Sequence, residues 1–242
     1  MNIVYLYRLS SVSRAKHDHS PRMTLSFFMI ELYALRLTLN FFYTWPGLTK
    51  QDWRYDNLKS SCPSILWPLL NFSGIMIFPT LLVYAGCVPM YYIAVSQSST
   101  NILDVVGCFV IISGIYISFL SDRQLHRFNA VKKEGDVMDI GLWGISRHPN
   151  YFGEIIVWWG LLLIGLGANS TEYLFMSIGA ISITLLFVFV SIPMMEERSL
   201  QRRPLYSRLI GDVSFLVPWP RKNKTLVEQG FQRKIVIKAK DQ

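Results

Sequence analysis

Apolar residues occur along this chain in long blocks separated by short polar segments, rather than as narrow stripes at helical or strand spacing. Blocks of this length match a bilayer, because about 20 helical residues cross its hydrocarbon core. The pattern therefore predicts an all-α, polytopic transmembrane helix bundle with about five spans. The predicted spans cover residues 24–43, 65–94, 102–121, 151–168 and 173–194.

The second predicted span is longer than a bilayer requires and contains Pro68, Pro79 and Pro89. Proline removes a helical hydrogen bond, so this span is expected to be kinked or broken by a re-entrant piece. No separate hydrophilic domain is expected. The chain divides into an N-terminal segment (1–22), a transmembrane domain (23–220) and a basic tail (221–242).

Lysine and arginine gather in alternate loops of the predicted bundle. The loops at 96–101 and 169–172 contain neither residue, whereas the segments between spans one and two, between spans three and four, and after span five are basic. Basic loops stay in the cytosol, so these segments and the C-terminus are predicted to be cytosolic. The N-terminus is then lumenal or extracellular, which Arg8, Arg14, Lys16 and Arg22 oppose mildly.

The net charge of +8 follows mostly from this topology. The expected partners are therefore the lipid bilayer and a hydrophobic small-molecule substrate, and nucleic acid is not expected. Cys62, Cys87 and Cys108 lack metal-ligand spacing, so neither a metal site nor a structural disulfide is predicted. The ending Lys238-Ala-Lys240-Asp-Gln242 resembles a dilysine retrieval signal, which indicates the endoplasmic reticulum if the protein is eukaryotic. The sequence indicates no oligomeric state.

The stretch from Gly141 to Glu154 carries the densest chemistry. Pro149 suits the first turn of a helix, where its missing N–H costs nothing, so a helix is predicted to begin there. The free N–H groups of that turn, beside Arg147 and His148, predict a site for phosphate or carboxylate. Asn150 and Glu154 share one face of this helix. A carboxylate one turn inside an apolar helix is costly against lipid, which predicts a protein-lined or wet cavity there.

Two further polar stripes occur on predicted spans. Tyr33, Arg36 and Asn40 lie on one face of the first span, which also contains Glu31. They either face a substrate cavity, or Glu31 and Arg36 merely neutralise each other or reach the interface. At the end of the third span, Ser118, Asp122, His126 and Asn129 repeat at helical spacing. This second stripe fits a binding role or an ordinary polar helix end equally well.

The fifth span leads into a basic segment. Glu196, Glu197 and Arg198 are predicted to emerge as this helix reaches the cytosol, and Tyr206 follows shortly afterwards. Trp219 lies between two prolines and is expected to re-enter the membrane interface, where it closes a cytosolic lid.

Four motifs in order resemble the membrane proteins grouped with the C-terminal domain of steroid 5-alpha-reductases. The resemblance runs from about Ser20 to Pro220 and implies a helical membrane fold that binds NADPH at its cytosolic end. It also implies reduction of a carbon–carbon double bond in an isoprenoid or steroid-like lipid. The motifs are Asp52-Trp-Arg-Tyr55, Ser121-Asp122-Arg-Gln-Leu-His-Arg-Phe128, Ser146-Arg-His-Pro-Asn-Tyr-Phe-Gly-Glu154, and Arg203-Pro-Leu-Tyr206 through Phe215-Leu-Val-Pro-Trp219.

The resemblance also suggests roles for individual residues. Tyr33 and Arg36 resemble a Tyr-x-x-Arg element whose tyrosine lies at the substrate carbonyl, so Tyr33 is the candidate proton donor, with Glu31 as a second catalytic candidate. Arg36 and Asn40 are the candidate substrate contacts. The expected cofactor-binding set is Asp122, Arg147, His148, Asn150, Tyr151, Glu154, Glu197, Arg198 and Tyr206.

The chain departs from the steroid reductases in three places. It contains no helix with their catalytic glutamate before the tyrosine helix, and Leu209 and Asn129 stand where that family has a tyrosine and a basic residue. A truncated product, a divergent enzyme and an inactive relative are all consistent with these differences.

Two other classes remain open. Arg147-His-Pro-x-Tyr-x-Gly153 followed by Glu196-Glu197 also resembles membrane methyltransferases for isoprenylcysteine or phospholipid amines, which bind S-adenosylmethionine. The other class is a non-catalytic lipid-binding membrane protein. The Asp52 and Asp122 motifs favour the reductase.

Overall fold

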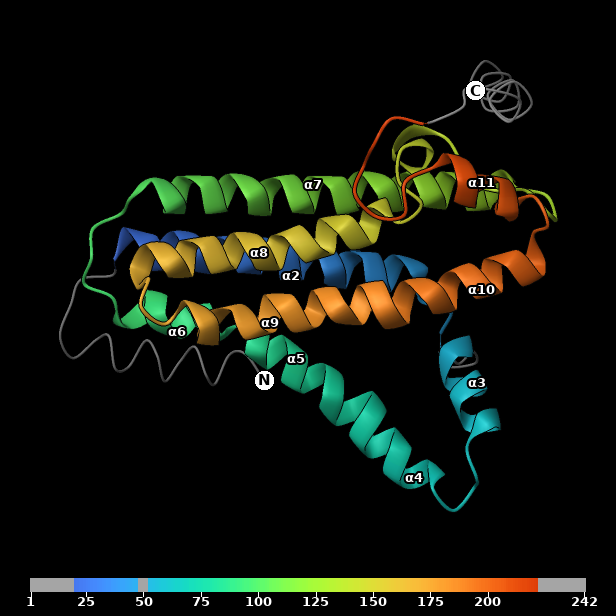
Figure 1. Ribbon diagram of the computed structural model, residues 1–242, viewed down its shortest axis with the longest axis horizontal. Coiled ribbons are helices and arrows are strands. Elements are labelled where there is room, and N and C mark those ends of the chain that lie inside the picture. The colour runs from blue at the N-terminus through green and yellow to red at the C-terminus, as the bar shows by residue number, and fades with distance from the viewer. Residues whose placement is uncertain (1–19, 48–51, 222–242) are drawn as a thin grey trace. The chain divides into compact units, whose positions relative to one another are not determined.

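The computed structural model describes residues 20–47 and 52–221, which form helices joined by turns, with no strand among them (Figure 1). The all-α prediction is therefore confirmed. The C-terminal dilysine-like sequence and three of the four opposing N-terminal cations lie outside these residues. The helices are α2 (Pro21–Thr44), α3 (Trp53–Ser61), α4 (Trp67–Leu70), η1 (Asn71–Ile77), α5 (Phe78–Gly86), α6 (Val88–Val95), α7 (Ile102–Val131), η2 (Gly141–Gly144), α8 (Pro149–Ala168), α9 (Tyr173–Leu186), η3 (Phe187–Ser191), α10 (Ile192–Arg202) and α11 (Tyr206–Asp212).

Among residues 20–47 and 52–221, five helical rods are long and apolar enough to cross a membrane, as the hydropathy pattern predicts. Two of them continue well past the C-terminal ends of the predicted spans. α7 continues to Val131, and the last rod continues to Arg202, because polar residues with good helix propensity follow each apolar block. Pro193 does not end the last rod, since the wider π-helical turn η3 precedes it and relieves the proline clash.

The long second span is divided as its prolines predict. Pro68, Pro79 and Pro89 each lie in the first turn of a new segment, where their missing N–H is tolerated. Cys87 separates α5 from α6, and Figure 1 shows α4 and α5 as one diagonal rod that changes direction at this junction. No re-entrant piece is needed to account for the length of this segment.

The segment between the first two spans, of which residues 51–56 were expected to be a polar-aromatic loop, contains helix α3. Asp52 caps this helix, because its carboxylate accepts a hydrogen bond of 2.9 Å from the backbone N–H of Arg54. Such a cap stabilises a short helix by about 1 kcal/mol. The pattern of Asp followed by a polar helical turn was available in the sequence.

The chain forms two compact units, and the first consists of residues 1–109 and 158–183. One end of its described part is held by a buried ion pair in which Arg22 donates to both carboxylate oxygens of Asp104 at 2.7 and 2.8 Å. Arg22 also donates to Ser98 Oγ and to the carbonyl of Ser99, both at 2.7 Å. Because Asp104 neutralises Arg22, this arginine no longer opposes the predicted topology as a free cation.

The second unit consists of residues 110–157 and 184–242. Within its described part, α7 and α8 cross very closely at Gly114 and Gly153. A Cβ on Gly153 would lie 2.7 Å from the Gly114 carbonyl oxygen and 2.8 Å from the Ser118 backbone nitrogen. Only glycine fits this approach, which fixes the start of α8 against α7.

Gly153→Ala is expected to destabilise the protein by roughly 1 to 3 kcal/mol, the usual cost of overpacking. Thermal unfolding of the detergent-solubilised protein measures this effect. Gly211→Ala is the matched control: nothing lies within 4 Å of its added Cβ, and it should be neutral or stabilising, because alanine favours helix. Equal stability of the two variants would show that the crossing is loose.

Candidate functional site

Hydrogen bonds connect the loop before α8 to the segment that follows α11. The backbone N–H of Arg147 donates to the Ser214 carbonyl at 2.9 Å, and the Trp219 N–H donates to the Ile145 carbonyl at 2.9 Å. Between them, Ser146 Oγ donates to the Leu216 carbonyl at 2.6 Å and accepts from the His148 N–H at 3.1 Å. These bonds hold two segments about 70 residues apart in sequence as one rigid corner.

Arg147 is the centre of this corner. Its Nε donates to Glu196 Oε1 at 2.6 Å, and its Nη1 donates to the carbonyls of Ile210 and Val213, both at 2.9 Å. The side chain is only 7% exposed. Arg147 therefore fixes α10 and the end of α11 to the start of α8, and only Nη2 makes no hydrogen bond within the described residues.

His148 completes the polar cluster and leads to an aromatic one. Its Nε2 lies 3.2 Å from Glu196 Oε1. The imidazole stacks on Tyr151, with ring centroids 5.7 Å apart, and Tyr151 in turn contacts Phe187 at 4.8 Å. Phe215 lies against both the His148 ring and the Arg147 guanidinium. These ring contacts exclude water and strengthen the charged hydrogen bonds beside them.

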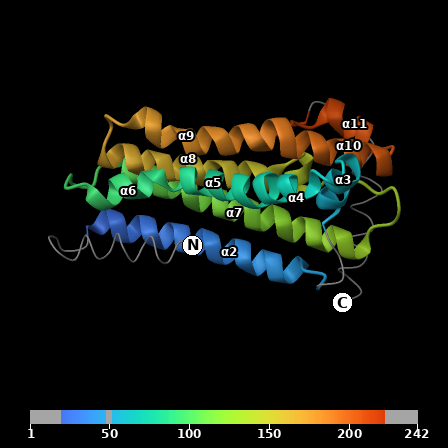
Figure 2. The same ribbon diagram turned by 90° about the horizontal axis from the view of Figure 1, so that it is seen from below.

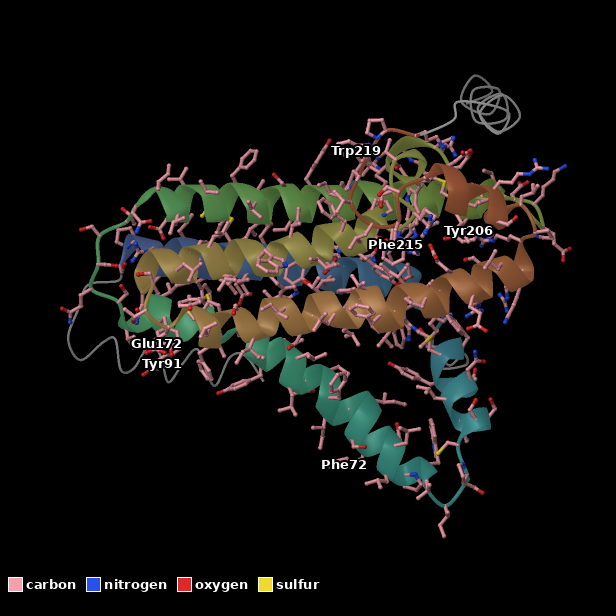
Figure 3. The ribbon with its side chains drawn as sticks, in the orientation of Figure 1. Phe72, Tyr91, Glu172, Tyr206, Phe215 and Trp219 are labelled. Atoms are coloured by element: carbon pink, nitrogen blue, oxygen red, sulfur yellow. The ribbon has the colours of Figure 1, made fainter. Side chains whose placement is uncertain are left out.

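Tyr206 joins the cluster from α11 and is buried in a small core with Val137, Leu209 and Val213. Burial raises the pKa of its phenol well above the ordinary value, and the nearby Glu196 carboxylate raises it further. The phenol therefore stays protonated and can donate a hydrogen bond at any physiological pH. Figure 3 shows Tyr206 and Phe215 near the first turn of α8, with Trp219 farther out along the same segment.

Trp219 was expected to insert at the membrane interface. Its backbone is fixed to Ile145, while its side chain remains 69% exposed. An exposed indole on an anchored backbone suits an interfacial position.

The structure thus gathers four predicted cofactor-binding residues around Glu196, namely Arg147, His148, Tyr151 and Tyr206. Three others lie on α7 and α8, at the contact between Ser118 and Asn150 or one turn from it along the helix. Ser118 Oγ donates to the Asn150 carbonyl at 3.2 Å. Asp122 lies one turn beyond Ser118 on α7, and Glu154 lies one turn beyond Asn150 on α8; both are half-buried.

Glu197 and Arg198 occupy different surroundings. Glu197 is exposed and Arg198 is half-buried, so their predicted contact with a cofactor stays a prediction. The adjacent Glu196 forms the pair with Arg147 and His148. Sequence spacing could not distinguish two neighbouring carboxylates, because helix rotation alone decides which one faces inward.

The stripe on α2 lies in the first unit. Tyr33 is buried, with its ring edge-to-face against Trp158 at 5.8 Å, and Arg36 and Asn40 are half-buried on the same face. Glu31 is exposed, as expected for a residue roughly 200° around the helix from Tyr33. The two catalytic candidates therefore do not share a face.

Sequence reasoning also missed a buried carboxylate. Asp139 is 1% exposed, and its Oδ2 accepts a hydrogen bond of 3.2 Å from Arg221 Nη2. Phe215 was identified only as part of a motif, and its ring contacts with His148 and Arg147 were not predicted. The carbonyls of Ile210 and Val213 were missed as well, because they act through backbone position, which no residue pattern reveals.

The fold and the cluster define a polytopic helical membrane protein with a charged, aromatic-lined corner at the start of one span. Residues 2–210 match the family described as a protein of unknown function, DUF1295, and the chain belongs to that family.

Two curated proteins are similar to parts of the chain. An uncharacterised protein of Schizosaccharomyces pombe is 24% identical over 175 residues, which cover 63% of this chain and 51% of that protein. A steroid 5-alpha-reductase of Arabidopsis thaliana is 44% identical over 57 residues, which cover 23% of this chain and 22% of the enzyme. The chain thus spans about half or less of each relative that it matches. No solved structure matches it.

The short match suggests a reductase-like membrane family, in agreement with the resemblance seen in the motifs.

Proposed function

We propose that this protein reduces a carbon–carbon double bond in a steroid-like or isoprenoid lipid within the membrane, with NADPH as the hydride donor. The 44% identity over 57 residues to a steroid 5-alpha-reductase carries this proposal. The buried cluster of Arg147, His148, Glu196 and Tyr206 supports it, because such a cluster can hold polar ligand groups in fixed positions.

The donor set of the second unit fits a dinucleotide. Asn150, Asp122 and Glu154 offer amide and carboxylate groups, which suit the carboxamide and the ribose hydroxyls. Tyr206 offers a phenol that stays protonated, and Arg147 retains Nη2 for an anionic oxygen. When bound, NADPH would supply the hydride. The protein would orient it and exclude water.

In the first unit, the α2 stripe is the proposed lipid-binding element. The buried Tyr33 would donate a hydrogen bond to the oxygen of an enone substrate, and the half-buried Arg36 and Asn40 would position that end of the lipid. Glu31, being exposed, is the weaker catalytic candidate.

The proposed orientation places α10, α11 and the C-terminus in the cytosol, where NADPH is available. The alternation of basic and charge-free loops supports this orientation. Residence in the endoplasmic reticulum stays a proposal based on the C-terminal sequence.

A ligand that binds only the native state must stabilise it, by about 2.7 kcal/mol at a concentration of 100 times Kd. NADPH is therefore expected to raise the Tm of the purified protein, whereas S-adenosylmethionine should not. Asp122→Ala and Asn150→Ala should weaken the NADPH effect, while the exposed Glu134→Gln should preserve it. A rise with S-adenosylmethionine alone would replace the reductase with a methyltransferase.

That alternative stays open because Glu196, part of the Glu-Glu sequence shared with membrane methyltransferases, contacts Arg147 and His148. If neither cofactor changes the Tm, the non-catalytic lipid-binding class is favoured.

A further inference from the structure

We infer that Lys132, Arg202 and Arg203 form a binding site for a phosphate dianion, at the end of the second unit where α7 and α10 terminate. Figures 1 and 2 both show these two helices ending at the same end of that unit. Lys132 directly follows α7, Arg202 is the last residue of α10, and Arg203 is its C-cap.

Backbone hydrogen bonds anchor the chain at Lys132 and at Arg203. The Lys132 N–H donates to the Phe128 carbonyl at 2.9 Å, and Phe128 is 1% exposed in a core that includes Met138. The Arg203 N–H donates to the Ser199 carbonyl at 2.9 Å. The Arg203 carbonyl accepts from the Tyr206 N–H, also at 2.9 Å. Lys132 and Arg203 thus extend from anchored backbone, which favours a formed site.

The charges of this cluster are uncompensated. Within residues 20–47 and 52–221, none of the three cations forms an ion pair, and Lys132 Nζ donates only to the neutral Asn129 Oδ1, at 2.8 Å. Partial burial lowers the pKa of Lys132, and the positive charges of Arg203 and Arg202 lower it further. A bound anion would relieve this repulsion.

The C-terminus of α10 does not by itself explain why three cations gather here. The negative end of the α10 dipole favours one cation, Arg202, in its last turn. It does not account for Arg203 beyond the helix end, or for Lys132 from another helix. Three cationic donors at one end of the unit, two of them guanidinium groups, match a phosphomonoester, whose three oxygens accept several charge-assisted hydrogen bonds.

Two sources carry this chemistry: the 2′-phosphate of NADPH and the phosphorylated headgroup of an anionic lipid. The nucleotide source rests on the proposed function, whereas the lipid source does not. The cluster lies outside the set of residues expected to bind the cofactor.

The test uses the full chain in nanodiscs. Its soluble probes are 2′,5′-ADP and 5′-AMP, and its lipid probes are phosphatidylcholine vesicles with and without phosphatidylinositol 4-phosphate. We expect tighter binding of the probe with the additional phosphate. Lys132→Gln and Arg203→Gln should each weaken that binding about tenfold, the order expected for one charge-assisted hydrogen bond. Arg208→Gln on α11 is the matched control, since it removes the same charge from an exposed residue outside the cluster.

Selective loss of 2′,5′-ADP binding would support the site with a nucleotide ligand, and selective loss of vesicle binding would support it with a lipid ligand. No preference for the additional phosphate in either pair, or an equal loss in Arg208→Gln, would overturn the inference. NADPH stabilisation that is unchanged in both cluster variants would leave the proposed reductase intact while removing this site. Vesicle binding that depends on the cluster, without any stabilisation by NADPH, would support this site and remove the proposed reductase.

Discussion

Arg147→Ala is expected to destabilise the protein by about 3 to 5 kcal/mol, the usual cost of leaving a buried charge without its partner. The variant removes the pair with Glu196 and the hydrogen bonds to the Ile210 and Val213 carbonyls. Thermal unfolding in detergent should show a Tm lower by on the order of 10 °C. The segment after α11 should also become sensitive to limited proteolysis, because Arg147 fixes it to α8.

Arg147→Lys separates charge from geometry. Lysine keeps the positive charge but cannot place donors on Glu196 and on two carbonyls at once, so an intermediate loss is expected. Arg202→Ala, an exposed cation at the end of α10, is the control and should change stability by less than about 1 kcal/mol. A loss for Arg147→Ala no larger than this control would mean that the corner does not depend on Arg147.

Asp104→Ala is expected to cost a similar amount, about 3 to 5 kcal/mol. The change leaves the guanidinium of Arg22 buried and without its carboxylate; the two side chains are only 1% and 4% exposed. The serine contacts of Arg22 cannot replace the charge. Thermal unfolding in detergent, with membrane insertion checked in parallel, measures the loss.

The double variant Arg22→Met with Asp104→Leu should recover most of this stability, because a buried ion pair can often be replaced by apolar side chains of similar volume. Arg54→Ala is the control: it opens the exposed pair with Asp52, at 44% and 34% exposure, and should cost at most about 1 kcal/mol. Failure of the double variant to recover stability would mean that the polar network around Arg22, rather than the charge pair, holds this end of the unit.

Much of the fold was predictable because membrane spans are encoded locally. A run of about twenty apolar residues predicts a span wherever it occurs in a sequence, and Pro149 likewise marks the start of α8. The apolar block placed the end of the third span at residue 121, because a polar helix beyond the bilayer lacks the apolar signal; only the helical spacing of Ser118 to Asn129 indicated that α7 continues toward Val131. α3 was missed for the same reason, although Asp52 marks its cap.

The candidate site was predictable in its residue types and only partly in its pairing. An anion site was expected at Arg147. In the structure, most donors of its guanidinium are already used, because they form hydrogen bonds with Glu196 and with two backbone carbonyls. Glu197 was selected where Glu196 faces the cluster, since two adjacent helical residues differ by about 100° in direction. Asp139 and Asp104 carried no signal, because their partners lie 82 residues away in sequence.

The sequence by itself determined that the part of the chain described by the structure carries five apolar helical spans, where its helices bend or begin, and which segments carry charge. These properties depend on the transfer of local segments from water to lipid. Only the tertiary structure decided that Arg147 and Arg22 hold buried structural ion pairs, that Glu196 is the central carboxylate, and that α7 and α10 end at the same end of the second unit. Those roles depend on which charges meet after folding, because a charge in a low-dielectric interior needs a partner, and that partner can come from any part of the chain.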